Sequence, residues 1–183
     1  EHVKIYKAAN CFDIFDPDTE QIVLECREEN LGFFTKMLRF TDYKRMTPFN
    51  MVVKTTTGQK IVTVRRGVSF FRSTVEVLNE QDALIGKFKQ HFFSIGGKFE
   101  VLDQNERSLC MLKGTWTSWD FKFISNDGKE FATVTKKWNG LGKELFTSAD
   151  NYILQINSEV PADHPLRELI LAAVMCIDLV LKE

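Results

Sequence analysis

The sequence predicts a mainly β fold in which a closed antiparallel barrel surrounds a buried C-terminal α-helix. Between residues 11 and 156, short segments that alternate apolar and polar residues are separated by turn residues. The last stretch, residues 165–181, is apolar on nearly every side of a helix and must therefore be shielded from water. An open sheet would leave two bare edges and one uncovered side of this helix, so closure is favoured.

The strands are expected to form successive hairpins. The first hairpin turns at Asp16–Asp18, and later turns are centred near Gly58, Gln81, Gln104 and Asp127 at an even spacing. About eleven or twelve strand segments result, which is more than the roughly eight whose barrel is filled by side chains alone. The predicted barrel is therefore wide enough to admit a helix.

The helix over residues 165–181 is predicted to be the core of a single domain that spans residues 1–183. Its unbroken apolar part, Leu169 to Ile177, covers about half of a bilayer's ~30 Å hydrocarbon core, and Asp178 follows it. No stable transmembrane span is expected from this segment. Asp163 is predicted to cap the helix, with Pro165 in the first turn. The residues expected to fill the core are Leu169, Ile170, Ala173, Val174 and Ile177.

Composition is that of a soluble globular protein. The 183 residues are 44% hydrophobic and carry a net charge of −1, which argues against a nucleic-acid partner. The four cysteines lie far apart without a CxxC pair, so they are expected to be reduced thiols of an intracellular protein. We expect a cytoplasmic monomer, peripheral to the inner face of a membrane.

Phenylalanine is abundant, with sixteen residues that include the adjacent pairs Phe33-Phe34, Phe70-Phe71 and Phe92-Phe93. Neighbours on a strand point to opposite faces, so each pair either packs between covered surfaces or exposes a ring. Core packing is favoured over an exposed membrane-touching patch. The basic pairs, among them Arg65-Arg66, are expected to lie on solvated strand faces.

Catalytic signatures are absent from the sequence. The three histidines stand alone without an HExxH motif. Gly140-Leu141-Gly142-Lys143 lacks the Ser or Thr that follows the lysine of a phosphate-binding loop. The protein is therefore expected not to be an enzyme.

One segment carries a specific motif. Lys136-Lys137-Trp138-Asn139-Gly140 is followed by Phe146-Thr147-Ser148-Ala149-Asp150-Asn151-Tyr152 and then by the apolar helix with Ile177-Asp178. In this last quarter the chain resembles the phospholipid scramblase family. The resemblance implies a Tubby C-terminal-like barrel, also found in LURP-one-related proteins, with about twelve strands around a hydrophobic helix.

The resemblance also implies a calcium loop, because clustered oxygen ligands suit this cation. Its candidate ligands are Asp150, Asn151, Ser148 and Glu159, and Ser148 stands where the family has an aspartate. With so few carboxylates, calcium affinity should be weak, and no other cofactor is expected. The alternative is a strand-connecting turn in which Asp150 and Asn151 bond their own backbone.

The predicted function is non-enzymatic association with phospholipid, either weakly calcium-responsive lipid binding or transbilayer lipid movement. Lysines beside a tryptophan suit an anionic membrane interface, and the candidate lipid-binding residues are Lys136, Lys137, Trp138 and Lys143. The alternative is a phosphoinositide- or protein-binding scaffold module of the Tubby or LURP-one kind without scramblase activity. A small-ligand carrier with a cavity beside the helix is a third hypothesis.

Overall fold

The fold is a ring of twelve strands followed by one helix. The computed structural model describes residues 2–8, 11–16, 18–29, 48–67, 74–90, 98–115, 118–136 and 150–181. The elements are, in chain order, β1 (His2–Ala8), β2 (Cys11–Phe15), β3 (Ile22–Glu28), β4 (Phe49–Thr55), β5 (Lys60–Arg66), β6 (Thr74–Leu78), β7 (Leu84–Gln90), β8 (Phe99–Asp103), β9 (Ser108–Thr115), β10 (Asp120–Ser125), β11 (Glu130–Lys136), β12 (Asp150–Ile156) and α2 (Leu166–Leu181).

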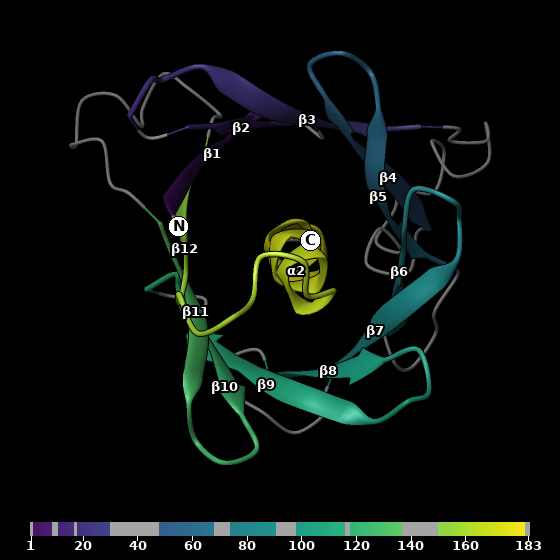
Figure 1. Ribbon diagram of the computed structural model, residues 1–183, viewed down its shortest axis with the longest axis vertical. Coiled ribbons are helices and arrows are strands. Elements are labelled where there is room, and N and C mark those ends of the chain that lie inside the picture. The colour runs from purple at the N-terminus through teal and green to yellow at the C-terminus, as the bar shows by residue number, and fades with distance from the viewer. Residues whose placement is uncertain are drawn as a thin grey trace.

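Every strand pairs antiparallel with its neighbours in the chain, and β1 pairs with β12 as well as with β2. The strand order is therefore a closed barrel, and Figure 1 looks down it with α2 at the centre. Successive antiparallel strands reverse direction, so alternate connections lie at the same end of the barrel. The mainly β class, the antiparallel pairing and the C-terminal helix are confirmed.

The two ends of the barrel are distinct, and we name them by their connections. The turn end holds the β2–β3, β4–β5, β6–β7, β8–β9 and β10–β11 turns and the linker of residues 157–165. The opposite end is where β3, β5, β7, β9 and β11 finish and where β12 begins. The predicted Phe pairs all lie outside the described residues.

The hairpin turns repeat one hydrogen-bonding pattern. In the β6–β7 turn the Asn79 N–H donates to Ala83 O at 2.9 Å and the Asp82 N–H donates to Asn79 O at 3.1 Å. The Asn79 Oδ1 also accepts the N–H of Gln81 at 3.0 Å. Equivalent backbone bonds occur in the β4–β5, β8–β9 and β10–β11 turns, where the left-handed residue is Gly58 (φ 88°), Glu106 (φ 63°) or Gly128 (φ 90°). Three-residue loops of this kind are typical of tight hairpins.

The interior is filled by α2 and by the inward residues of the strands. Leu169, Ile170, Ala173, Val174 and Ile177 are each 0–1% exposed. Gly86 of β7 lies so close to the helix that a Cβ built there would be 2.8 Å from Leu169 Cδ2. The helix needs no polar face because the barrel surrounds it. In the described part of the chain, no helix has the length and apolarity needed to cross a membrane.

The helix begins with a cap that the sequence did not predict. The N–H of Leu166 donates to His164 Nδ1 at 3.1 Å, so His164 takes the capping position predicted for Asp163. The Arg167 guanidinium donates to the carbonyl oxygens of Val160 and Pro161 at 3.0 Å and fastens the linker to the first turn. The predicted capping residue, Asp163, is one residue too early in the chain. The helix starts at Leu166, and the side chain of His164 is the one placed to accept the free N–H of that residue.

Candidate functional site

The candidate site lies at the opposite end, where β11 finishes at Lys136. Along β11, Ala132 and Val134 are buried, and Lys136 follows them on the same inward face. Its ammonium lies 5.9 Å from the centroid of the Trp119 ring, within the range of a cation–π contact. The Lys136 N–H also donates to Trp119 O at 3.1 Å. The lysine is therefore held at the mouth of the barrel by both its backbone and its side chain.

Trp119 belongs to a cluster of three aromatic side chains on which the Lys136 side chain packs. The centroid of its ring lies 5.5 Å from that of Tyr152 in β12. The centroid of the Phe121 ring in β10 lies 6.0 Å away, and these two rings meet edge to face. Trp119 is only 9% exposed and adopts φ 50°, a conformation that is uncommon for a bulky residue. The hydrogen bond from Lys136 to Trp119 O helps to hold this backbone shape. The cluster supplies an apolar surface directly below a cation.

Of the four predicted lipid-binding residues, the structure places Lys136. Lys137, Trp138 and Lys143 lie between β11 and β12, outside the described residues. The sequence prediction missed Trp119 and Tyr152 as partners of Lys136. The spacing of these residues along the sequence does not reveal the contact. Trp119 lies next to Lys136 because β10 pairs with β11 in a register that sets Asp120 opposite Thr135.

Glu159 is not brought together with the other predicted calcium ligands. Asp150 and Asn151 begin β12 and are register partners of Lys7 and Tyr6 in β1, so they belong to a strand and not to a turn. Six strand steps of about 3.3 Å, about 20 Å in all, separate Asp150 from Ile156, and Glu159 lies beyond Ile156 at the turn end. Since calcium ligands lie about 2.3–2.6 Å from the ion, Glu159 is not a ligand of an ion held by Asp150.

The other calcium candidates remain a prediction. Ser148 is outside the described residues. Among the residues that the structure describes, no group of three or more His, Cys, Asp or Glu side chains is arranged to hold a metal ion. Calcium binding by Asp150, Asn151 and Ser148 is therefore a proposal that needs a direct measurement.

A second cation enters the barrel at Arg66, contrary to the prediction that the Arg65-Arg66 pair is solvated. Arg65 is exposed, whereas Arg66 is 3% exposed and shares the inward face of Val62 and Val64. Its guanidinium lies 4.8 Å from the centroid of the Phe49 ring. Adjacent strand residues point to opposite faces, so both arginines cannot be outside.

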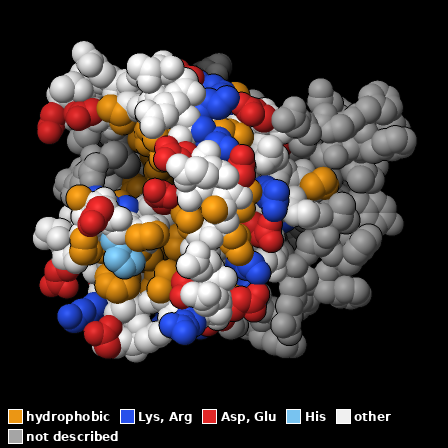
Figure 2. Space-filling view, turned by 45° about the vertical axis from the view of Figure 1, so that its right-hand side comes forward, with side chains coloured by type: hydrophobic (Ala, Val, Ile, Leu, Met, Phe, Trp, Pro, Cys, Tyr) orange, Lys and Arg blue, Asp and Glu red, His pale blue; other side chains and the backbone are white. Residues whose placement is uncertain are grey.

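The outer wall carries charges of both signs in close pairs. Arg65 pairs with Glu76 at 3.0 Å, Lys122 pairs with Glu130 at 2.9 Å, and Arg27 pairs with Asp13 at 2.6 Å. Figure 2 shows blue and red side chains interspersed over one face of the barrel. A wall of mixed charge has no large field of one sign.

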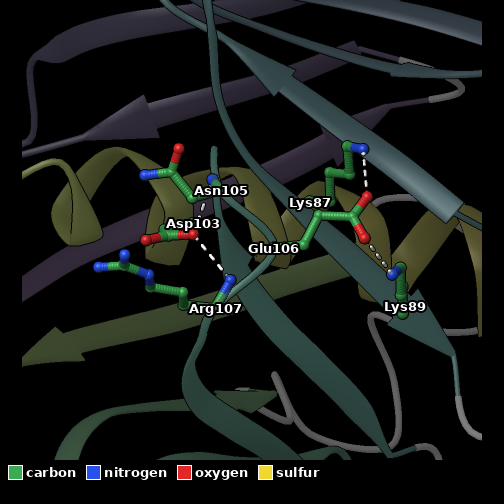
Figure 3. A network of polar contacts seen from close by, with 6 residues as sticks. All are labelled: Lys87, Lys89, Asp103, Asn105, Glu106 and Arg107. Carbon is green, nitrogen blue, oxygen red and sulfur yellow. Dashed lines mark hydrogen bonds and ion pairs between the residues drawn. The ribbon is translucent and has the colours of Figure 1, made fainter.

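Figure 3 shows one of these groups at close range. Glu106, from the β8–β9 turn, lies between Lys87 at 2.9 Å and Lys89 at 3.3 Å. The hydrogen bond from Lys87, and then that from Lys89, lowers the pKa of the Glu106 carboxyl, while Glu106 raises the pKa of Lys87. Both lysines are thus already engaged with a carboxylate, which leaves less of their charge for an external anion.

The four cysteines differ in reactivity, which gives a testable prediction. Burial raises the pKa of the Cys26, Cys110 and Cys176 thiols to about 12, whereas Cys11 is exposed. Thiolate is the reactive form, and near pH 8 a thiol with a pKa of about 12 is roughly one part in ten thousand ionised. Titration of the native protein with a thiol reagent at pH 8 should modify one cysteine, and unfolding in denaturant should raise the number to four. Rapid native modification of more than one would contradict the burial.

Comparison with known proteins assigns the family. The family model described as Scramblase matches residues 1–183. A yeast protein, the Altered inheritance rate of mitochondria protein 25 of Saccharomyces cerevisiae, is 23% identical over 178 residues, which is 84% of this chain and 54% of that protein. The chain thus spans about half the length of this relative. An Arabidopsis thaliana protein solved by X-ray crystallography superposes with a TM-score of 0.59 at 16% identity, covering 97% of this chain and 90% of that one, and so shares the fold. The predicted resemblance is confirmed, and the chain belongs to the Scramblase family.

Proposed function

We propose that this domain binds the head groups of anionic phospholipids at the opposite end of the barrel. The observation that carries the proposal is the ammonium of Lys136 held 5.9 Å from the Trp119 ring at the mouth of the barrel. Lys137 and Trp138 follow directly in the sequence, and Lys143 comes five residues after Trp138. Lysine attracts anionic head groups, and tryptophan is enriched at the membrane–water interface. Membership of the Scramblase family supports a lipid-related role.

The packing of α2 favours head-group binding over lipid movement by this helix. To act as a translocating element, α2 would have to leave the barrel, and side chains that are 0–1% exposed would lose their cover. Each fully buried Leu or Ile side chain contributes about 1.5–3 kcal/mol through burial. Binding at the rim requires no such opening, so the proposal places the lipid outside the closed barrel.

Vesicle binding tests the proposal. The protein should co-sediment with phosphatidylcholine vesicles that contain phosphatidylserine, and binding should weaken as salt is raised. The double variant Lys137→Gln/Lys143→Gln should lose affinity about thirtyfold, since each basic residue near an anionic surface contributes about 1 kcal/mol. Absence of binding at low salt would refute the proposal.

A matched control separates a local site from a general effect of charge. Arg107 and Lys129 are exposed cations of the turn end. The variant Arg107→Gln/Lys129→Gln removes the same number of charges and should bind vesicles within about twofold of the wild type. An equal loss in both double variants would mean that net charge, and not the β11–β12 end, controls binding.

Two further measurements test the alternative function, a phosphoinositide- or protein-binding scaffold, and the proposed calcium binding. Binding to phosphoinositide vesicles alone would favour a phosphoinositide-binding scaffold, and binding to neither lipid would favour a protein-binding scaffold. Isothermal titration with calcium, with and without phosphatidylserine vesicles, tests the weak site proposed at Asp150, Asn151 and Ser148. A null result in both arms would remove calcium from the proposal.

A further inference from the structure

Two arginines lie at opposite ends of the barrel that encloses α2. Arg167, in the first turn of the helix, donates to the carbonyl oxygens of Val160 and Pro161 at 3.0 Å and ties the helix to the linker at the turn end. Arg66 is the last residue of β5 and lies at the opposite end. The contact made by Arg167 holds only the N-terminal turn of α2, so the C-terminal half depends on other interactions.

Arg66 carries its charge inside the barrel. It shares the inward face of Val62 and Val64, which are both 0% exposed, and is itself 3% exposed. Its guanidinium lies 4.8 Å from the centroid of the Phe49 ring in β4, and Phe49 is buried as well. A buried cation is costly unless its surroundings compensate the charge, and the face of the Phe49 ring provides part of that compensation.

Arg66 lies at the level of the C-terminal half of α2. The helix begins at Leu166, and at 1.5 Å rise per residue Cys176 lies about 15 Å further along it. The seven residues of β5 extend about 20 Å, which is about 15 Å along the barrel axis for a strand tilt near 40°. α2 lies against β5. Burial raises the pKa of the Cys176 thiol to about 12, and the charge of Arg66 acts in the opposite direction, as expected for neighbours.

The C-terminal end of α2 favours a nearby cation. The last four carbonyl oxygens of a helix lack intrahelical donors, and this end carries about half an elementary negative charge. At the positive N-terminal end, Glu168 lies in the first turn of α2, but the last turn contains no Lys or Arg. Arg66 therefore supplies from the barrel wall a positive charge that the end of the helix does not carry itself.

We infer that Arg66 is a latch for the C-terminal half of α2: it holds this half inside the barrel, and its removal frees this half without unfolding the rest of the domain. The N-terminal turn remains fastened by Arg167. The freed half would emerge at the opposite end, where β11 finishes at Lys136. The inference is independent of the proposed lipid binding, and its test requires no lipid.

Two buried cysteines can report the opening. The background variant is Cys11→Ser, which removes the exposed thiol. Cys176 lies on α2 at the level of Arg66, whereas Cys110 is near the start of β9, at the turn end. Both are 0–1% exposed, so a thiol reagent reaches them only when the structure opens. Release of the C-terminal half of α2 should expose Cys176 but not Cys110, whereas global unfolding exposes both.

The variant Arg66→Met keeps an apolar side chain of similar length and removes the charge. In native buffer at pH 8, the rate of Cys176 modification relative to that of Cys110, measured by peptide mass spectrometry, should rise about tenfold. The direct effect of the charge has the opposite sign. Arg66 lowers the pKa of Cys176 and favours its thiolate, so removal of Arg66 slows the reaction in the closed state. A selective rise therefore reports opening of the helix.

Arg65→Met is the matched control, since Arg65 is the exposed neighbour of Arg66 and pairs with Glu76 at 3.0 Å on the outer wall. Its ratio of Cys176 to Cys110 modification should stay within about twofold of the background protein. Two results with Arg66→Met overturn the inference. Equal acceleration at both cysteines would mean that Arg66 stabilises the whole fold, and an unchanged ratio without acceleration would mean that it holds nothing.

A milder variant covers the case in which Arg66→Met does not fold. Phe49→Leu keeps the charge of Arg66 but removes the ring on which the guanidinium stacks. The ratio of Cys176 to Cys110 modification should rise about threefold, the effect expected of a single cation–π contact. A ratio equal to that of the background protein would overturn the latch.

Discussion

Replacement of Ala173 by aspartate in the middle of α2 is expected to prevent the barrel from reaching a stable native state. Ala173 is 0% exposed and lies in a helix that the barrel encloses. An unpaired carboxylate there would lose its hydration, and the effective penalty of several kcal/mol for a buried ion is comparable with the ~5–15 kcal/mol stability of a typical domain. Urea unfolding followed by circular dichroism should show a much lower midpoint or no folded baseline.

A matched control exists just outside the helix. Ala162 is an exposed residue of the linker, so Ala162→Asp introduces the same side chain into water. The free energy of unfolding of this variant should lie within about 0.5 kcal/mol of the wild type. If Ala173→Asp unfolded at the same urea concentration as Ala162→Asp, α2 would not be the core of the fold.

The substitution Gly86→Ala is expected to destabilise the fold by about 3 kcal/mol, at the upper end of the usual cost of overpacking. A Cβ at this position would lie 2.4 Å from the backbone oxygen of Leu102 and 2.8 Å from Leu169 Cδ2. The Leu169 side chain can adjust, but the Leu102 carbonyl belongs to the β7–β8 pairing and cannot move without disturbing it. The measurement is the free energy of unfolding in urea, with the slope of the transition checked for two-state behaviour.

Gly67 provides the matched comparison for Gly86. No atom lies within 4 Å of a Cβ built at Gly67, so Gly67→Ala meets open space. Its effect should be within about 1 kcal/mol and in the stabilising direction, because alanine reduces the freedom of the unfolded chain. Equal losses of stability in the two variants would show that glycine flexibility, and not the close approach of β7 to α2 and β8, is what matters.

The hairpins were predictable because their signals are local. The predicted centres at Gly58, Gln81, Gln104 and Asp127 all lie within the observed turns, where polar side chains close the loop on their own backbone. The positive φ of Gly58 follows from its lack of a Cβ. The positive φ of Glu106 could not be foreseen, because the turn's hydrogen bonds hold that residue in a shape it rarely adopts.

The candidate site was only partly predictable because its residues come from different hairpins. A linear motif identified Lys136, but its contact with Trp119 depends on the register of β10 against β11. Glu159 is close to Asp150 in the sequence, yet an extended strand carries the two to opposite ends. The short distance along the chain therefore misplaced Glu159 alone, since nine extended residues span the barrel whereas nine helical residues make only about two and a half turns.

The sequence by itself determined the hairpin rhythm, the positions of the turns and the need to bury the C-terminal helix. These properties depend on the alternation of side chains along a strand and on the exclusion of apolar surface from water, which each segment expresses alone. Only the tertiary structure decided that the Trp119 ring lies against Lys136, that Arg66 turns inward and that acidic residues from five separate connections lie at one end of the barrel. Such groupings arise when the ring closes, because strand register and direction then place residues that are distant in the chain at a common end.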